Sequence, residues 1–164
     1  MGMTSMNAPR YSPAEFESLV LLASEWVIGQ EEVVLHQGIP LSESQIADAL
    51  QVGVSRPERV RLLSIAEIPI PDNAVLRRFC EASKTLSPAT KALSARYGIL
   101  IRSDQWCRRD IIVHELTHTA QYERLGGIRS FLEHYLRECL TIGFPHGSME
   151  QEAITTAARI CAES

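Results

Sequence analysis

Two histidines and a glutamate in the second half of the chain have the spacing of a zinc-hydrolase site. His114, Glu115 and His118 stand in the segment IIVHELTH. In a helix, residues four apart lie on the same face, so both imidazole rings can point at one metal ion. Zinc accepts imidazole nitrogens at about 2.0–2.1 Å and prefers four ligands. The pattern therefore predicts a zinc site on a helix, with His114 and His118 as two of its ligands.

Glu115 lies one step around the same predicted helix, where its carboxylate can reach a zinc-bound water without binding the metal. Zinc lowers the pKa of such a water towards about 7, and a carboxylate can take its proton. The apolar residues 111–113 indicate that the helix is buried at this point. The alternative is a helix that carries two unrelated histidines. A purely structural metal site has no use for Glu115, so this residue favours catalysis.

The third metal ligand must come from farther along the chain. A metzincin would have Gly at position 121 and His or Asp at position 124, but this chain has Gln121 and Arg124. Five downstream residues could supply the ligand: His134, Glu138, His146, Glu150 and Glu152. The last two lie in SMEQEAITTAA, which is typical of the beginning of a helix with Ser148 as its N-cap.

A longer stretch resembles a family of uncharacterised bacterial metallopeptidases. VHELTHTAQYERLGG…FLEHYLRECLTIGFPHGSMEQEA follows their core of H-E-[LV]-x-H-x-x-Q-Y, a Tyr- and Leu-rich helix, and P-x-x-x-E-x-E-A. The resemblance covers residues from about 97 to 153, and more loosely PERVRLL…IPIP upstream. It implies a gluzincin-like zinc site rather than a particular substrate.

In related gluzincins the third ligand is the first glutamate of an E-x-x-A or E-x-x-x-D pattern. The resemblance thus implies Glu150 as the ligand, with Ala153 as the small residue and Glu152 as the competing candidate. Ile154 stands where the second pattern has Asp. This departure leaves the outer-shell partner of the metal ligands unassigned.

Two further features could form part of a substrate cleft. The segment GILIR, at residues 98–102, could be a strand that pairs with an extended substrate through main-chain hydrogen bonds, or an ordinary strand of a sheet. Tyr135 is our candidate for stabilising the oxyanion, since a phenol can donate a hydrogen bond, and Tyr122 is a weaker one. A tyrosine in an amphipathic helix also commonly belongs to the core.

The hydrophobic periodicity and the turn residues predict an α+β fold that is mostly helical, with a small sheet packed on the HExxH helix, as in a minimal gluzincin-like protein. Ser12 with Glu15, and Ser42 with Gln45, are typical of capping boxes at helix starts. One predicted helix begins at residue 12, and the other predicted helices cover 42–53, 72–83, about 104–125, 129–141 and 148–162. The predicted strands are RVRLLSIAEIPI and YGILIRS.

The chain of 164 residues suggests one compact domain, in which an N-terminal helical supporting region (1–58) precedes the metallopeptidase-like core (59–164). The segment SESQIADALQVGVSRPERVRLL superficially resembles a helix-turn-helix. However, its turn glycine falls two residues late, and Pro57 followed by a strand-like pattern would interrupt the recognition helix. We expect a helix, a turn and a strand here.

The composition and charge bound the choice of partners. A net charge of −4 gives no electrostatic reason to expect nucleic acid as a partner. The longest apolar run, LVLLA, is far shorter than a bilayer span, and the N-terminus has no apolar secretory segment. We therefore expect a cytoplasmic location, without membrane contact. Four widely spaced cysteines should stay reduced, with Cys107 or Cys139 packed in a core.

These observations predict a zinc-dependent metallopeptidase that hydrolyses peptide bonds with a metal-activated water. Its cofactor would be Zn²⁺, its partner a peptide or protein substrate, and its catalytic residues Glu115 and Tyr135. The alternative is a non-catalytic zinc-binding domain that acts as a partner or regulatory module.

Overall fold

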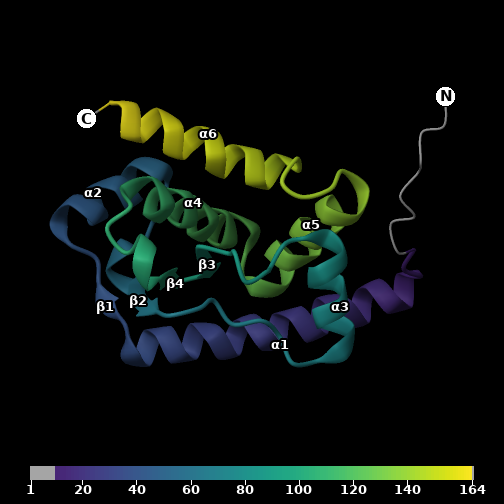
Figure 1. The fold of residues 1–164 in the computed structure, drawn as a ribbon. Coiled ribbons are helices and arrows are strands. Elements are labelled where there is room, and N and C mark those ends of the chain that lie inside the picture. Colours follow the sequence, from purple (N-terminus) through teal and green to yellow (C-terminus); the bar gives the residue numbers. More distant parts are fainter. Residues whose placement is uncertain (1–9, 164) are drawn as a thin grey trace.

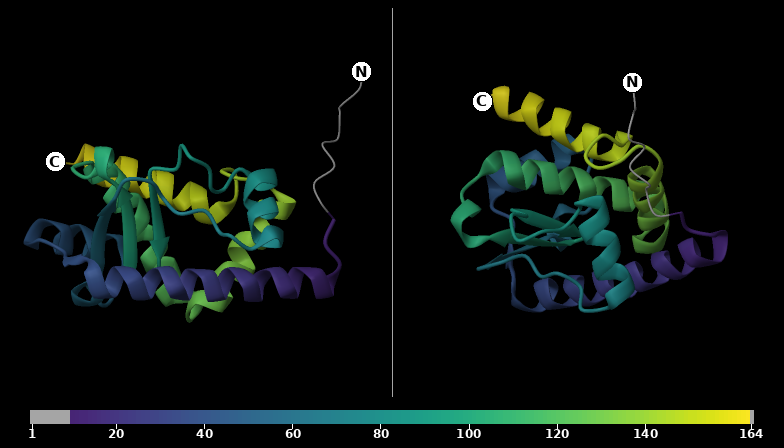
Figure 2. Two further views of the ribbon diagram at one scale, coloured as in Figure 1. Left: turned by 60° about the horizontal axis from the view of Figure 1, so that its bottom comes forward. Right: turned by 45° about the vertical axis from the view of Figure 1, so that its right-hand side comes forward.

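A four-stranded mixed sheet lies at the centre of the fold, with helices on both of its faces (Figure 1). The computed structural model describes residues 10–163. Helix α1 (Pro13–Gln37) runs under the sheet, α4 (Arg109–Leu125) covers the opposite face, and α6 (Ser148–Ala162) packs on α4 (Figures 1 and 2). This α+β arrangement of one domain confirms the predicted fold class.

The sheet has the order β1-β2-β4-β3, with β4 at its centre and β3 at one edge. The strands are β1 (Ile39–Pro40), β2 (Arg61–Ile65), β3 (Ala92–Ala95) and β4 (Gly98–Arg102). Strand β4 pairs with β2 in parallel and with β3 in antiparallel fashion. The expectation that GILIR could pair with a substrate is therefore wrong, since both sides of β4 are already occupied.

Helix α1 packs so closely on the sheet that only a glycine fits at the start of β4. A Cβ atom at Gly98 would lie 2.9 Å from Cβ of Val34 and 3.2 Å from Cα of Glu31. The same turn of α1 is anchored electrostatically. The buried Glu31 carboxylate accepts two hydrogen bonds from Arg96 at 2.8 Å, and one from the backbone amide of Tyr97 at 3.0 Å. These contacts fix the β3–β4 turn on α1.

Several helix starts were predicted correctly. Helices α1 and α2 (Glu43–Val52) begin with the capping boxes of Ser12 and Ser42, and Asn73 caps α3 (Ala74–Ser83). Helix α5 covers Ile128–Thr141. After α2 the chain forms a 3₁₀ turn over Pro57–Arg59 and then strand β2, so this segment has no second helix.

Other boundaries were predicted wrongly. Helix α4 begins at Arg109 rather than near residue 104, because residues 103–105 form a separate 3₁₀ turn. Strand β2 ends at Ile65, well before the two prolines expected to close it. Strands β1 and β3 were not predicted. Cys107 is exposed, whereas Cys139 packs against the core as expected.

Two hydrophobic clusters meet at the sheet and at α4. One joins α1, α3 and α5 through Leu19, Phe79, Phe131 and their neighbours. The other packs β2 and β4 on one face of α4. Residues from the region before 59 and from the region after it share these clusters, which is why they form one domain.

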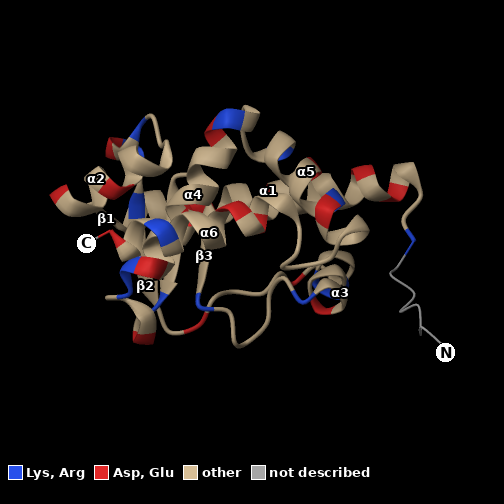
Figure 3. Ribbon diagram, turned by 90° about the horizontal axis from the view of Figure 1, so that it is seen from above, with Lys and Arg blue, Asp and Glu red and all other residues tan. Residues whose placement is uncertain are grey.

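Figure 3 shows Lys and Arg interspersed with Asp and Glu along the fold, whereas the carboxylates of Glu31, Asp48, Glu115 and Glu150 are buried. None of the helices within residues 10–163 combines the length and the apolar character that crossing a bilayer requires. Residues 1–9, on which the expectation about a secretory signal rests, lie outside the described part of the chain.

Candidate metal centre

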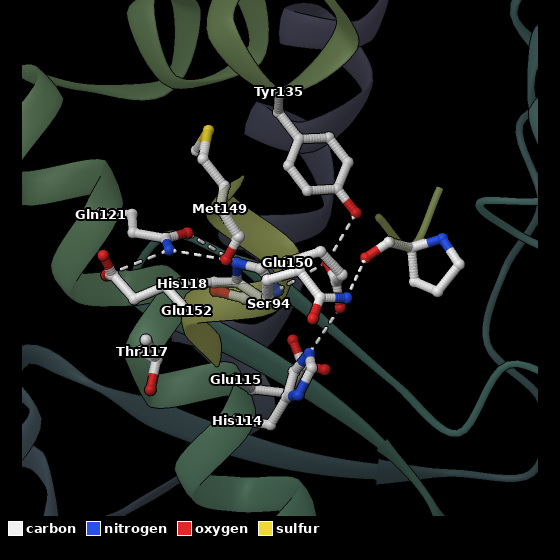
Figure 4. Close-up of polar contacts among 12 residues, drawn as sticks. Ser94, His114, Glu115, Thr117, His118, Gln121, Tyr135, Met149, Glu150 and Glu152 are labelled. Carbon is white, nitrogen blue, oxygen red and sulfur yellow. Dashed lines mark hydrogen bonds and ion pairs between the residues drawn. The ribbon is translucent and has the colours of Figure 1, made fainter. Parts of the chain in front are cut away.

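Helix α4 holds His114 and His118 in a fixed orientation because apolar residues pack on two sides of it. Ile112, Leu116 and Ala120 face the sheet. Val113 instead packs against residues of α6. The two histidines, four residues apart, therefore point together towards a cavity beside the sheet edge, with their ring centroids 5.0 Å apart (Figure 4). His118 is buried, and His114 is partly exposed.

Glu150 reaches the two histidines from the first turn of α6. Its Oε1 lies 2.7 Å from Nε2 of His114, and its Oε2 lies 3.2 Å from Nε2 of His118 (Figure 4). The ligand atoms of these three residues all lie within 4.8 Å of one another. The fold therefore brings together two residues of the HExxH motif and the glutamate favoured as third ligand, which stands 32 positions after the second histidine.

The chemistry of this group fits a metal ion. Two imidazole nitrogens and one carboxylate oxygen form a donor set that zinc uses in catalytic sites, where three protein ligands leave a fourth position for water or substrate. Because the three side chains are mostly buried, they have little contact with solvent, and their neighbours hold them in one conformation. The group of His114, His118 and Glu150 could therefore hold a metal ion.

The electrostatics of the metal-free group are those of a buried ion pair. Burial alone would lower the pKa of His118, but the hydrogen bond to Glu150 and the charges of Glu115 and Glu150 raise it to about 9. Burial alone would raise the pKa of Glu150, but hydrogen bonds from both histidines bring it well below its usual value. Without a metal, Glu150 is therefore ionised and His118 protonated near neutral pH.

Glu115 lines the same cavity but stands apart from the three candidate ligands. It is buried, and this burial raises the pKa of its carboxyl, while the charges of His114 and His118 and the backbone of Ser94 act in the opposite direction. Ser94 belongs to the edge strand β3. Glu115 thus lies near both the histidine pair and the edge strand β3, and its catalytic role stays a prediction.

The structure brings Tyr135 into the site and leaves Tyr122 outside the ligand group. The Tyr135 hydroxyl donates to Oε2 of Glu150 at 2.9 Å (Figure 4). The Tyr122 hydroxyl donates to the backbone carbonyl of Ser94 at 3.2 Å, and its ring stacks on Phe131. Burial raises the pKa of both phenols, so both stay protonated. The oxyanion role of Tyr135 stays a prediction.

The other candidates for the third ligand have different partners. Glu152 is exposed and accepts hydrogen bonds from Arg124 and Gln121. Glu138 accepts from the backbone amide of Met149 at 3.1 Å and from the hydroxyl of Ser148. His134 and His146 are exposed.

The start of α6 differs from the prediction of Ser148 as its N-cap. Gly147 occupies the N-cap position, and the carboxylate of Glu138, reaching across from α5, accepts the hydrogen bonds that a capping side chain would accept. Sequence reasoning considered Glu138 only as a metal ligand, and its spacing along the chain gives no hint of this capping role.

A cavity of about 660 Å³ opens beside the ligand group. His114, Glu115, His118, Tyr135 and Glu150 line one end of it. Its other walls come from α1, α3 and α5 and from the segment that leads into β3, and they include Trp26, Val27, Leu76, Phe79 and Leu136. The volume lies in the range of small-molecule sites. The three candidate ligands are therefore accessible from a mostly apolar cavity.

Two features of this site were missed by sequence reasoning. Strand β3 forms the sheet edge beside Glu115, but its sequence ALSA is short and weakly alternating. In the sequence analysis Gln121 served to exclude a metzincin and stood as the Gln of the resembling core motif, but it was given no role, although it contacts His118. The signal that could have pointed to it is its position three residues after His118, which places both on one helix face.

No protein-family model, curated protein or solved structure gives a significant match to this chain. The family resemblance of residues 97–153 therefore stays an expectation, and the functional argument depends on the geometry of the site.

Proposed function

We propose that this protein is a zinc-dependent peptidase in which His114, His118 and Glu150 hold the metal. The observation that supports this most directly is that the HExxH histidines and Glu150 form one compact group at the end of an open cavity, with Glu115 beside it. A structural zinc site is normally closed by four protein ligands, whereas three ligands and a cavity suit catalysis.

A zinc ion held by these residues would supply a Lewis acid that polarises the scissile carbonyl and acidifies a water molecule. Glu115 would take the proton of that water and pass it to the leaving amine. Its raised pKa suits both steps, since an effective general base has a pKa near the working pH. Tyr135 would hold Glu150 in place through its hydroxyl and could turn towards the developing oxyanion.

The edge of the sheet supports an extended peptide as substrate. The amide of Arg102 donates to the carbonyl of Lys91, so antiparallel alternation directs the backbone groups of Ala92 and Ser94 away from β4. The Ser94 carbonyl already accepts from Tyr122. Ala92 would then offer its amide and carbonyl to a peptide that adds a strand to β3.

The walls of the cavity favour a substrate with a large apolar side chain near the scissile bond. Burial of apolar surface stabilises such a complex by about 25 cal/mol per Å², and the aromatic and aliphatic lining offers that surface. The first test measures zinc in protein purified without chelator or metal-affinity steps. We expect about one zinc per chain, and folded protein that takes up none would refute the proposal.

The second test incubates zinc-loaded protein with a peptide library that varies the residues around the cleaved bond. We expect cleavage next to Phe, Leu or Met. Full zinc occupancy with no cleavage of any peptide would instead favour the alternative, a zinc-binding domain that acts as a partner or regulatory module.

A further inference from the structure

We propose that Gln121 is a positioning residue that selects which nitrogen of His118 faces the metal and ties this ligand to the backbone of α6. The inference rests on the zinc site of the proposed function, but it does not depend on peptide cleavage. Gln121 contacts His118 on one side and residues of α6 on the other (Figure 4).

Two acceptors on α6 fix the orientation of the Gln121 amide. Its Nε2 donates to the backbone carbonyl of Met149 at 2.9 Å and to Oε1 of Glu152 at 3.2 Å. An amide nitrogen can only donate and a carbonyl oxygen can only accept. The reversed orientation would place the amide oxygen against two other oxygens. The amide oxygen of Gln121 therefore points the other way, towards His118.

This orientation determines the tautomer of His118. Oε1 of Gln121 lies 2.8 Å from Nδ1 of His118, and because this oxygen can only accept, Nδ1 must carry a proton. In the neutral ring the lone pair then belongs to Nε2. Nε2 is also the nitrogen that lies near Glu150 in the ligand group. Gln121 thus presents to a metal the nitrogen that the fold has aimed at it.

The burial of Gln121 makes this arrangement rigid. The residue is 0 % exposed, so its amide has no access to solvent as an alternative partner. An unsatisfied buried amide costs about 1–3 kcal/mol, which disfavours other rotamers. Met149 directly precedes Glu150, so one side chain connects His118 on α4 with the backbone next to the ligand on α6.

Gln121 is also a candidate for the outer-shell partner of the metal ligands, which the sequence left unassigned. Ile154 stands where a carboxylate partner was expected, and it does not supply an outer-shell contact of that kind. Partners of this type fix the ring orientation and the tautomer of a metal-binding histidine. Here a carboxamide on the ligand's own helix, one turn further on, would take that role.

The experiment compares three variants by zinc titration against a competing chelator and by ¹H–¹⁵N spectra of the histidine rings in the zinc-loaded protein. Gln121→Leu keeps the bulk of the side chain but removes its hydrogen bonds. Glu152→Ala removes one exposed acceptor of Gln121 and leaves its contact with His118, so it is the matched control. Gln121→Met is closer in length to glutamine and also removes the hydrogen bonds to His118 and to α6, so it is a second test of the same loss.

We expect wild-type protein to show a protonated Nδ1 and a metal-bound Nε2 in His118. Gln121→Leu should raise the zinc dissociation constant by about 10–100-fold, which is typical for the loss of an outer-shell partner. It should also lose the slowly exchanging Nδ1 proton. Glu152→Ala should change the constant by no more than about twofold. Gln121→Met should show the same loss of affinity and of the Nδ1 proton as Gln121→Leu.

Wild-type affinity in a folded Gln121→Leu protein, or metal bound through Nδ1 of His118, would overturn the proposal. If Gln121→Leu does not fold, Gln121→Met decides, and wild-type affinity with a retained Nδ1 proton signal in that variant would be equally decisive. A lack of peptidase activity would refute the proposed function but would leave both of these measurements unaffected. Wild-type protein that binds no zinc would refute both ideas, and this result would already be evident before any variant is made.

Discussion

The two helices that carry the proposed metal ligands hold them in different ways. Helix α4 presents His114 and His118 through its own geometry, since residues four apart share a face of any α-helix. Helix α6 presents Glu150 from its first turn, and that turn is held by side chains of other helices. Glu138 of α5 accepts a hydrogen bond from the Met149 amide, and Gln121 of α4 donates one to the Met149 carbonyl. The α4 ligands are locally encoded, whereas the α6 ligand depends on tertiary contacts.

Because of this difference, we expect substitutions in the two helices to affect the candidate metal site differently. Substitutions on α4 that preserve the helix and its packing should leave the histidine pair together. Substitutions at the junction of α5 and α6 should displace Glu150 even where they lie outside the ligand group. Four predictions test this difference, beginning with the largest expected effect.

The sharpest test separates the two glutamates of α6. Glu150→Ala removes a ligand, so zinc affinity should fall by more than the roughly 10–100-fold that an outer-shell partner contributes. Glu152→Ala removes an exposed carboxylate that pairs with Arg124, and its zinc affinity should stay near that of wild type. Zinc titration of both variants decides the assignment, and the opposite pattern would make Glu152 the ligand.

The second test asks whether α4 contributes chemistry as well as ligands. Glu115→Gln keeps the size of the side chain but removes the base, so peptidase activity should fall by about 10²–10⁴-fold. Zinc content should stay near one per chain, because Glu115 is not a member of the ligand group. The measurement is kcat/KM on a cleaved library peptide, together with metal analysis. Unchanged cleavage would indicate a contaminant or a different mechanism.

The third test concerns the charge pair that joins the two helices in metal-free protein. The pKa of His118 is raised from 6.5 to about 9, so the folded state binds this proton more tightly than the unfolded state. The resulting stability is fully present below pH 6.5 and is lost as the pH rises to about 9. The free energy of unfolding of metal-free protein should therefore fall across this window.

Urea unfolding at several pH values in the presence of chelator measures this effect, and His118→Gln provides the control. The variant should lose most of the pH dependence between 6.5 and 9. If metal-free wild-type protein becomes more stable over that range, the His118–Glu150 pair is not charged as described.

The smallest effect is expected from a pair of glycine substitutions. A Cβ at Gly147 would collide with the Glu138 carboxylate and lie 2.9 Å from its Cβ, so Gly147→Ala should disturb the start of α6. Overpacking of this kind costs about 1–3 kcal/mol, and we expect weaker zinc binding with it. Gly29→Ala, in the interior of α1, meets nothing within 4 Å and should stabilise the protein by roughly 0.5–1 kcal/mol.

Thermal unfolding and zinc titration of the two alanine variants give both readouts. Gly147→Ala with unchanged zinc affinity would show that the α6 terminus tolerates displacement, and the contrast between the two helices would then be weaker than we infer.

Local signals made much of the fold predictable. The capping boxes at Ser12 and Ser42 determine where two helices begin, because the side chain of each residue satisfies an amide of its own first turn. The spacing of His114 and His118 likewise depends on one helix alone. In each case the interacting groups lie within four residues, so the sequence contains all the information that is needed.

The remaining features required contacts between distant segments. The edge strand β3 is defined by its pairing with β4, and its four residues have no strong strand pattern of their own. The N-cap of α6 was predicted to be Ser148, but Glu138 supplies the cap from another helix, which no local rule anticipates.

By itself, the sequence determined the histidine pair, the position of Glu115 beside it and an α+β fold with a helix starting near Glu150. Only the tertiary structure decided that Glu150 rather than Glu152 meets the histidines, and that Gln121 contacts His118 from one side and α6 from the other. The physical reason is that a helix fixes relations within one or two turns. The rotation and the axial position of α6 relative to α4 come instead from packing of Val113 against Ala157 and Ile160, together with buried hydrogen bonds between the helices.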